Sequence, residues 1–292
     1  MVALVGGATS PALAAKPSGR GGGGAGPTPT GNDISYPQCG GSLPAAPAFG
    51  IVGLTGGRAD DLNPCLGPYP SYTQSELYWA VASTVGGTSQ PKASLYVNTA
   101  DPGDVYNGTV IADWPTSGGN ATYGSCATTA VTLSSGSTAT VGANSDGCAW
   151  QYGYNMAVQD AGWLAEAASA INGQGAPVTV GGSAASYQWW LDVETANTWQ
   201  PDAAMNVADL QGMIAGLDAA GATTVGAYST SSQWGSVTGG SAPGSLYQIP
   251  VWIPGARSLS GAKGNCSQAS FTQGRVAVTQ WFGRPYDGDY AC

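Results

Sequence analysis

The chain has 292 residues, no histidine, six cysteines and only 9% charged residues, with 8 basic against 17 acidic side chains and a net charge of -9. The lack of histidine excludes Ser-His-Asp and Cys-His catalysis, His-ligated zinc and imidazole general bases, so that a hydrolytic enzyme of this sequence must use carboxylates, assisted by tyrosine, for proton transfer. The acidic charge balance is unsuited to binding phosphate backbones, and we expect no nucleic-acid partner.

The N-terminal residues differ in composition from the rest. Residues 1–15 form an apolar run ending in Ala12-Leu13-Ala14, which is typical of the end of a secretory signal, although the usual basic segment before it is missing. Residues 16–31 are rich in Gly, Pro and Thr and are predicted to be a disordered linker. No later stretch is apolar enough to span a bilayer, so we expect a secreted protein with no membrane span. Residues 32–292 contain no second linker and are predicted to form one domain.

The first third of this domain alternates strands with a helix. Strands are predicted at residues 31–36, 49–57 and 93–99, from their apolar and β-branched residues. A helix is predicted at 71–85, with Thr73 as its cap and Glu76 as the capping-box partner.

Residues 104–147 are rich in Gly, Ser and Thr and weakly patterned, and are interpreted as a long insertion that overhangs a cleft. The remaining predicted helices are 149–171 and 206–220, the second capped by Asn206; the remaining predicted strands are 187–195, 223–228, 249–253, 276–282 and 287–291.

This order predicts an α/β protein. Strands alternate with helices at first and are later joined by loops, which favours a single irregular (β/α) barrel of the TIM-barrel type with fewer helices in the C-terminal third. A doubly wound open sheet is the alternative fold.

The six cysteines predict three disulfides, because they are even in number and widely spaced in an apparently exported chain. Sequential pairing, one of the fifteen that six cysteines allow, is preferred because each pair brackets a loop-rich segment. The predicted bonds are Cys39–Cys65, Cys126–Cys148 and Cys266–Cys292. No CxxC pair is present, and we expect no metal site and no cofactor.

The strand predicted at 187–195 ends in two carboxylates, Asp192 and Glu194, separated by Val193. Side chains alternate across a strand, so both acids would leave the same face with Cα atoms roughly 6.6 to 7 Å apart. Two such acids repel each other, and one usually keeps its proton, which is the arrangement of a general acid beside a charged partner. From the spacing alone, two solvated acids at a strand-to-loop corner are an equally good interpretation.

Other polar residues recur near the predicted strand ends, which meet at one mouth of a barrel. They are Asp33, Asp101, Tyr228, Gln280 and Asp287. Any one of them alone is more simply a surface or capping residue, but their joint recurrence indicates a site. Exposed tryptophans suit sugar rings, and the stacking candidates are Trp199, Trp234, Trp252 and Trp281, although most tryptophans are core residues.

Three segments of the sequence stand out together: Asn32–Tyr36, Trp190–Glu194, and Val278–Phe282 followed by Tyr286–Tyr290. They resemble glycoside hydrolase family 25 or the related glycoside-hydrolase-like barrel domains. The resemblance implies an irregular barrel and a muramidase that cuts peptidoglycan between N-acetylmuramic acid and N-acetylglucosamine. It also implies that Glu194 is the general acid and that Asp192 is the companion that stabilises the positive transition state or the acetamido group of the substrate. Asp33 resembles the acid of the first strand, and Asp287, or alternatively Asp289, resembles the acid near the C-terminus.

The sequence therefore predicts a secreted, monomeric glycoside hydrolase of a cell-wall polysaccharide, with peptidoglycan as the preferred substrate. In this hypothesis the charge of Asp192 and apolar neighbours such as Trp190 keep Glu194 protonated. The alternatives are a non-catalytic carbohydrate-binding or cell-surface barrel, and a glycosidase of a different polysaccharide, for which the insertion is the discriminating feature. The same-face pair fits either a retaining or an inverting reaction. The expected substrate contacts are Asp33, Asp101, Tyr228, Trp252, Gln280, Trp281, Asp287 and Asp289.

Overall fold

A computed structural model describes residues 29–292 of the chain. The predicted signal-like segment, 1–15, and nearly all of the predicted linker lie outside the described residues. The first strand begins at Thr30, two residues before the predicted start of the domain. None of the helices in the described part of the chain is both long and apolar enough to cross a membrane.

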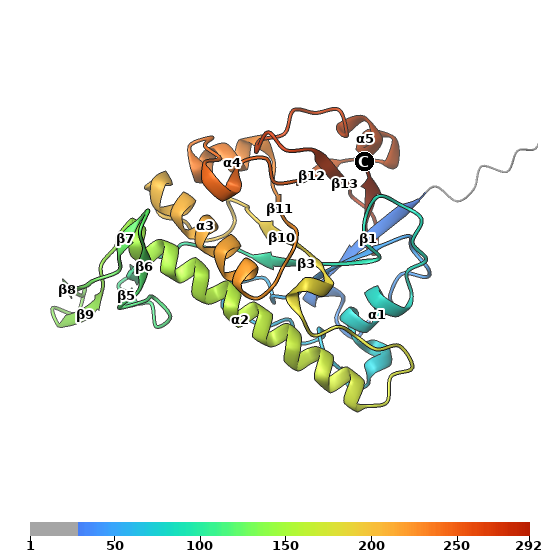
Figure 1. Cartoon of the computed structure of the whole chain (residues 1–292), viewed down its shortest axis with the longest axis horizontal. Helices are drawn as coiled ribbons and strands as arrows, with labels where there is room; N and C mark the ends of the chain where they lie inside the picture. The colour runs from blue at the N-terminus through green and yellow to red at the C-terminus, as the bar shows by residue number, and fades with distance from the viewer. Residues whose placement is uncertain (1–28) are drawn as a thin grey trace, which may run out of the picture.

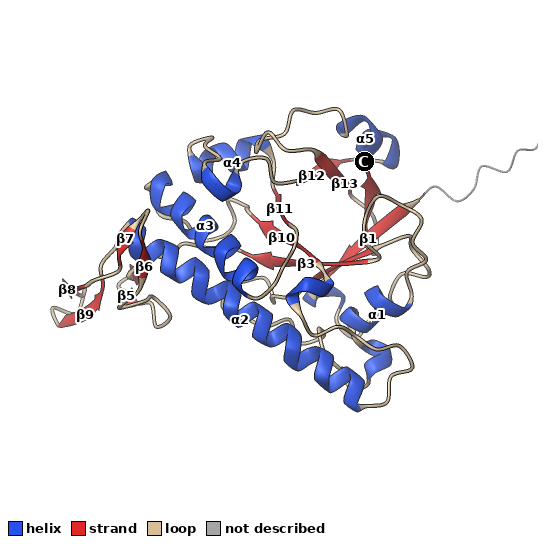
Figure 2. Ribbon diagram, in the orientation of Figure 1, coloured by secondary structure: helices blue, strands red, loops and turns tan. Residues whose placement is uncertain are grey.

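Eight strands close into a barrel (Figure 2). In the order of the ring they are β1 (Thr30–Ile34), β14 (Asp287–Ala291), β13 (Val276–Trp281), β12 (Val251–Ala256), β11 (Val225–Tyr228), β10 (Gln188–Asp192), β3 (Ala93–Asn98) and β2 (Gly50–Gly53). All neighbours pair in parallel except β14, which is antiparallel to both β1 and β13. The prediction of a barrel is confirmed, and the open-sheet alternative is excluded because the ring closes.

Helices follow most of the parallel strands and lie outside the ring (Figure 1). They are α1 (Glu76–Ala82), α2 (Asp146–Gly173), α3 (Ala203–Ala219), α4 (Ser231–Thr238) and α5 (Leu259–Asn265). Short 3-10 helices lie at η1 (Tyr36–Gln38), η2 (Tyr72–Gln74), η3 (Ala184–Ser186) and η4 (Gly244–Leu246). The late connections, predicted as loops, contain the short helices α4 and α5, while β13 and β14 are joined without one.

Two predicted helix caps are wrong. Ser75, not Thr73, caps α1, since its side chain accepts the N–H of Tyr78. Asp202, not Asn206, caps α3. Asn206 instead faces inward and donates to the backbone carbonyls of Gln200 and Val237. Several polar residues stand within one turn of each helix start, and the packing of the helix decides which of them is the cap.

Alternation along β10 divides the core into two layers. Trp190 belongs to the apolar cluster inside the barrel, together with Trp252 and Ile51. Trp189 and Leu191, on the opposite face, belong to the larger cluster between barrel and helices. The inside of the barrel is thus filled by indoles at depth, and only the strand ends remain for polar groups.

The long helices α2 and α3 run side by side along one flank of the barrel (Figure 1). Glycines permit their close approach, since a Cβ at Gly212 would lie 2.0 Å from the carbonyl oxygen of Trp150. A Cβ at Gly153 would lie 2.1 Å from the carbonyl oxygen of Asp209. These two helices fix the positions of the loops that follow β3 and β10.

The insertion consists of three small hairpins (Figure 1). They are β4–β5 (Val105–Tyr106, Thr109–Val110), β6–β7 (Gly119–Asn120, Gly124–Ser125) and β8–β9 (Thr128–Thr132, Thr138–Gly142). In Figure 1 the β8–β9 hairpin extends beyond the N-terminal end of α2, away from the barrel. This hairpin therefore does not overhang the barrel, whereas the insertion as a whole was expected to overhang a cleft.

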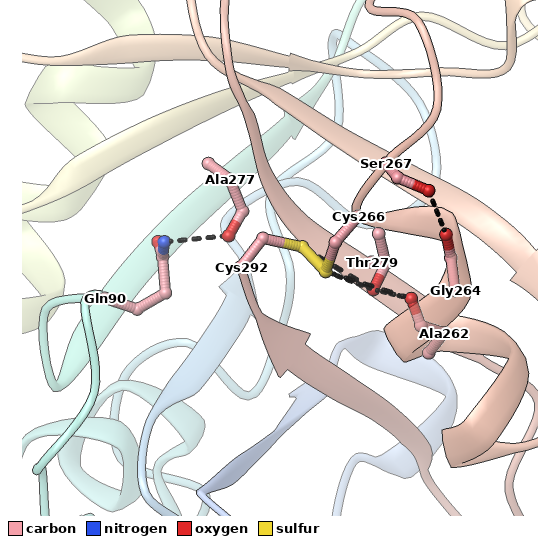
Figure 3. Close-up of a disulfide and its surroundings, with 8 residues drawn as sticks. All are labelled: Gln90, Ala262, Gly264, Cys266, Ser267, Ala277, Thr279 and Cys292. Atoms are coloured by element: carbon pink, nitrogen blue, oxygen red, sulfur yellow. Dashed lines mark hydrogen bonds between the residues drawn. A yellow bond between two sulfur atoms is a disulfide. The ribbon is translucent and has the colours of Figure 1, made fainter.

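All three predicted disulfides are confirmed. Cys39–Cys65 joins the loops that follow β1 and β2, and Cys126–Cys148 fastens the insertion to α2. Cys266–Cys292 fixes the last residue of the chain beside α5 (Figure 3).

Candidate active site

The two acids of the central strand lie at the mouth of the barrel. Asp192 is the last residue of β10, and Glu194 stands two residues later in the loop, so the strand is shorter than predicted. The loop is fixed on both sides of Glu194. Ser229 Oγ donates to the Val193 carbonyl at 2.7 Å, and the Thr195 N–H donates to Gln233 Oε1 at 2.8 Å. Glu194 is half-buried, whereas Asp192 is 5% exposed.

Asp192 has one strong hydrogen bond. Asn98 Nδ2, on β3, donates to Asp192 Oδ2 at 2.6 Å. Thr55 orients that amide, because its hydroxyl donates to Asn98 Oδ1 at 2.9 Å and accepts the Asn98 N–H at 2.8 Å. The other oxygen, Asp192 Oδ1, has no hydrogen-bond partner among the described residues. One face of the carboxyl group is therefore left for another molecule.

Burial, followed by the charge of Glu194, raises the pKa of Asp192 well above its usual range, although the Asn98 bond opposes this. Burial thus favours the protonated form of Asp192 in the free protein. We expected Asp192 to be the charged member. The physical reason for the difference is depth, because Asp192 ends a buried strand while Glu194 lies in a partly hydrated loop.

A second group of acids lies across the lumen. The Tyr228 hydroxyl donates to Gln280 Oε1 at 3.1 Å, and Gln280 Nε2 donates to Asp33 Oδ2 at 3.0 Å. Asp289, fully buried on β14, lies close enough to Asp33 for each carboxyl group to affect the pKa of the other, and neither Asp289 oxygen has a hydrogen-bond partner among the described residues. Burial raises the pKa of Asp33 to about 6, and burial and the charge of Asp33 raise the pKa of Asp289 well above normal.

Asp287, the other acid of β14, is placed differently. It pairs with Asp33 in the strand register, but its Oδ1 accepts the backbone N–H of Gly283 at 2.8 Å. Its charge raises the pKa of Asp33. Both acids of β14 thus act on Asp33, while Asp287 also holds the turn between β13 and β14.

The tryptophans divide between lumen and core. Trp252 is buried, with its ring centroid 4.4 Å from that of Tyr228, and forms the floor of the lumen. Trp281 occupies the opposite face of β13 from Gln280 and covers Gly288, so it lies outside the cluster. Trp234 stacks on Phe271 in the core. Trp199 is half-buried, and its Nε1 donates to the Glu194 carbonyl at 2.8 Å, next to the candidate acid.

Asp101 does not join the lumen acids. It is fully buried in the loop after β3, where burial raises its pKa to about 7. Its charge also raises the pKa of Asp209, on α3, so the two carboxyl groups form a separate buried pair. Its position after a strand suggested a mouth residue, but its backbone N–H donates to the Thr198 carbonyl at 2.9 Å and its charge acts on Asp209 rather than on the lumen acids.

Within the described part of the chain, the lumen acids have no cationic partner. The only ion pair in residues 29–292 is Arg58–Asp60, which is exposed. Buried carboxyl groups without cations retain protons, because an isolated buried charge is far more costly than the neutral form. The structure thus brings together two carboxyl pairs, Asp192 with Glu194 and Asp33 with Asp289, around the phenol of Tyr228.

Comparisons with known proteins agree with the resemblance that the sequence shows. A family described as lysozyme-like protein 1 matches residues 181–272, which contain the Asp192–Glu194 pair. Two curated relatives from Dictyostelium discoideum, "Probable GH family 25 lysozyme 4" and "Probable GH family 25 lysozyme 2", are 41% and 40% identical to this chain over 63 residues. Over these residues the chain is similar to lysozymes. Its resemblance to glycoside hydrolase family 25 is confirmed.

The extent of the match is limited. Each aligned stretch covers 22% of this chain and only 28% of the relative's own length. Among solved structures, the muramidase from Trichobolus zukalii is 13% identical with a TM-score of 0.46, covering 90% of this chain and 93% of its own. The lysozyme from Streptomyces coelicolor is 14% identical with a TM-score of 0.43, covering 90% and 92%.

Sequence reasoning missed Asn98 and Thr55. Asn98 lies near the end of a strand that was correctly predicted, and an asparagine at the C-terminal end of a barrel strand was an available signal. Its partner could not be read from the sequence, because Asn98 meets Asp192 only through the register of β3 with β10. Thr55 follows β2 in the same way and supports the amide rather than the acid.

Proposed function

We propose that this protein is a secreted glycoside hydrolase that cleaves a cell-wall polysaccharide, with peptidoglycan as the preferred substrate. The observation that carries the proposal is the fixed Asp192–Glu194 pair at the mouth of the barrel. Glycosidic cleavage needs an acid for the leaving oxygen and a negative partner for an oxocarbenium-like transition state, and two carboxyl groups supply both. The names of the lysozyme relatives support the same class.

Glu194 is assigned as the general acid, because it is the member of the pair that a substrate can reach. Its proton passes to the glycosidic oxygen as the bond from that oxygen to the anomeric carbon breaks, and water completes the hydrolysis. Asp192, with its free Oδ1, stabilises the positive charge or orients an acetamido group.

In the free protein, burial favours a proton on Asp192. A glycan that covers Glu194 excludes water from its carboxyl group and so favours protonation there. Positive charge at the reacting carbon then favours the ionised form of Asp192. The two acids thus exchange roles between the free protein and the transition state.

The non-catalytic alternative requires Asp192 or Glu194 to be neutralised by a salt bridge or turned away from the cleft. Neither acid takes part in an ion pair within residues 29–292. Asp192 is hydrogen-bonded on one oxygen only, and the charges of both acids act on Tyr228 in the lumen. We therefore favour catalysis. Export is supported by the three disulfides, which persist in oxidising compartments, and we propose that the protein acts as a monomer.

The test is incubation of the purified protein with peptidoglycan and other wall glycans, with new reducing ends identified by mass spectrometry. We expect the native protein to release fragments and Glu194→Gln to release none while keeping its thermal unfolding temperature. Glu166→Gln, an exposed position on α2, is the matched control and should be fully active. Near-normal turnover by Glu194→Gln would refute the assignment of Glu194 as the general acid. If the native protein releases no new reducing ends from any wall glycan, the proposed hydrolase activity is refuted.

A further inference from the structure

A cavity of about 230 Å³ lies beside the acid pair and is not part of it. Loops after β2, β3 and β10, helix α2 and the first hairpin of the insertion together enclose it. Its wall includes Thr99, Tyr106, Asp113, Tyr152 and Asn197. Ligand pockets for drug-sized molecules measure roughly 300–1,000 Å³, so this cavity suits one small ring.

The cavity adjoins the proposed reacting centre. Thr99 Oγ1 and Asn197 Nδ2 both donate to the Asp192 carbonyl, at 2.7 and 3.0 Å. Asn197 also ends the turn that starts at Glu194, since its N–H donates to the Glu194 carbonyl at 3.1 Å. A chain molecule with one ring at Glu194 can therefore place a neighbouring ring in the cavity.

The insertion wall is held in place rather than loosely attached. Trp114 is buried with its ring centroid 5.5 Å from that of Tyr152, and its Nε1 donates to the Ala143 carbonyl. Asn144 Nδ2 donates to Gln200 Oε1 at 3.0 Å, which ties the end of the insertion to the loop after β10. Together with the disulfide to α2, these contacts make the wall a preformed part of the cavity.

Tyr106 offers an exposed ring at this wall. It is 48% exposed and lines the cavity from β4. The hairpin that presents it turns at Asn107 and Gly108, both with positive φ, which fixes a tight two-residue loop. Tyr36 lies against Gly57, which also lines the cavity, and is 47% exposed. Exposed aromatic faces of this kind pack well against the apolar face of a sugar ring.

The charges of the lining favour a neutral ring. Arg58 is held by Asp60 through two hydrogen bonds of 3.0 Å, and Asp113 adds a further negative charge. Among the described residues that line the cavity, no cation remains without an acidic partner to attract a carboxylate. Hydroxyl, amide and phenol groups instead provide the polar contacts that a neutral sugar needs.

We propose that this cavity is a binding subsite for one neutral sugar ring of the substrate chain, built by the insertion and centred on Tyr106. This inference rests on the proposed function and adds to it a residue that determines how much of the glycan is bound. It also gives the first hairpin of the insertion a role in choosing the polysaccharide.

The test measures binding by calorimetry in a Glu194→Gln background, which prevents cleavage. The probes are peptide-free peptidoglycan strands of one disaccharide and of three disaccharide repeats. We expect Tyr106→Ala to weaken binding of the long strand by about threefold to tenfold, the range of an aromatic contact, and to leave the single disaccharide unchanged. Tyr247→Ala is the matched control, because Tyr247 is 49% exposed but precedes β12 at the opposite end of the barrel.

Equal binding of the long strand by Tyr106→Ala and its parent would overturn the subsite, as would an equal loss in Tyr247→Ala. The two proposals fail separately. Cleavage by the native protein together with equal binding by Tyr106→Ala overturns the subsite alone, whereas a length-dependent loss without any cleavage by the native protein overturns only the hydrolase.

Discussion

The hydrogen bond from Asn98 to Asp192 provides a direct test of the proposed roles of the acids. It is the one contact among the described residues that lowers the pKa of Asp192, against burial and the charges of Glu194 and Asp33. A hydrogen bond to a charged group contributes about 1.5–3 kcal/mol, and one pH unit corresponds to about 1.4 kcal/mol. Asn98→Ala should therefore move the acid limb of the pH–rate profile to higher pH by about 1 to 2 pH units.

The direction of this shift follows because the transition state requires Asp192 to be ionised. Without the amide, Asp192 holds its proton to higher pH, and the fraction of protein with an ionised Asp192 falls at any acidic pH. The assay is release of reducing ends from peptidoglycan between pH 3 and 9, with kcat and kcat/KM obtained at each pH. The displaced limb should appear in kcat, which reports the complex in which the bound glycan favours a proton on Glu194, and the maximal rate should also fall.

Asn63→Ala is the matched control for this measurement. Asn63 is likewise buried, and its Nδ2 donates to the Glu76 carboxylate at 2.7 Å, outside the cluster of lumen acids. The Asn63→Ala variant should have a lower free energy of unfolding, and the acid limb of its pH–rate profile should not move. A lower rate in Asn98→Ala with an unmoved limb would refute the reasoning, since Asn98 would then support only the fold.

Two predictions concern stability. Burial raises the pKa of Glu76 from 4.5 to about 7, so the stability that this residue contributes is fully present below pH 4.5 and is lost as the pH rises through 7. The unfolding free energy of Glu76→Gln, measured relative to that of the native protein by denaturant unfolding, should therefore be about 3 kcal/mol more favourable at pH 8 than at pH 4. A difference between the two proteins that does not change with pH would contradict this. A Cβ at Gly53 would lie 2.6 Å from the Ser35 Cβ and 2.8 Å from the Tyr96 ring, so Gly53→Ala should cost about 1–3 kcal/mol of unfolding free energy, while Gly235→Ala, which meets no atom, should cost far less.

The barrel could be predicted because strand and helix patterns recur along the chain in a βα order, and each parallel connection restricts the topology. The three disulfides followed from chain order, since each bond closes a local segment. The residues at which helices begin were harder to predict. Thr73 and Ser75 both suit an N-cap, and only the packing of α1 against the core decides that Ser75 takes this role. Local sequence thus determined the elements more firmly than their ends.

The site was predictable in its residue types and less so in its geometry. Gln280 and Trp281 are neighbours on one strand, so alternation alone allows only one of them to face the lumen, and that rule was available from the sequence. The greater depth of Asp192 was not available, because it depends on where β10 ends and on the loop that holds Glu194. The contact of Asn98 with Asp192 could not be predicted either, because it joins residues that are 94 positions apart in the sequence.

Replacement of Asp33 should shift the acid limb of the pH–rate profile in the direction opposite to that expected for Asn98→Ala. Its carboxyl group has a pKa of about 6, and the charge that it carries once ionised raises the pKa of Asp192. Asp33→Asn removes that charge and should move the acid limb to lower pH, whatever it does to the maximal rate. Asn98→Ala and Asp33→Asn thus displace one limb in opposite directions through one carboxyl group. A shift of both variants in the same direction would show that the limb belongs to a group other than Asp192.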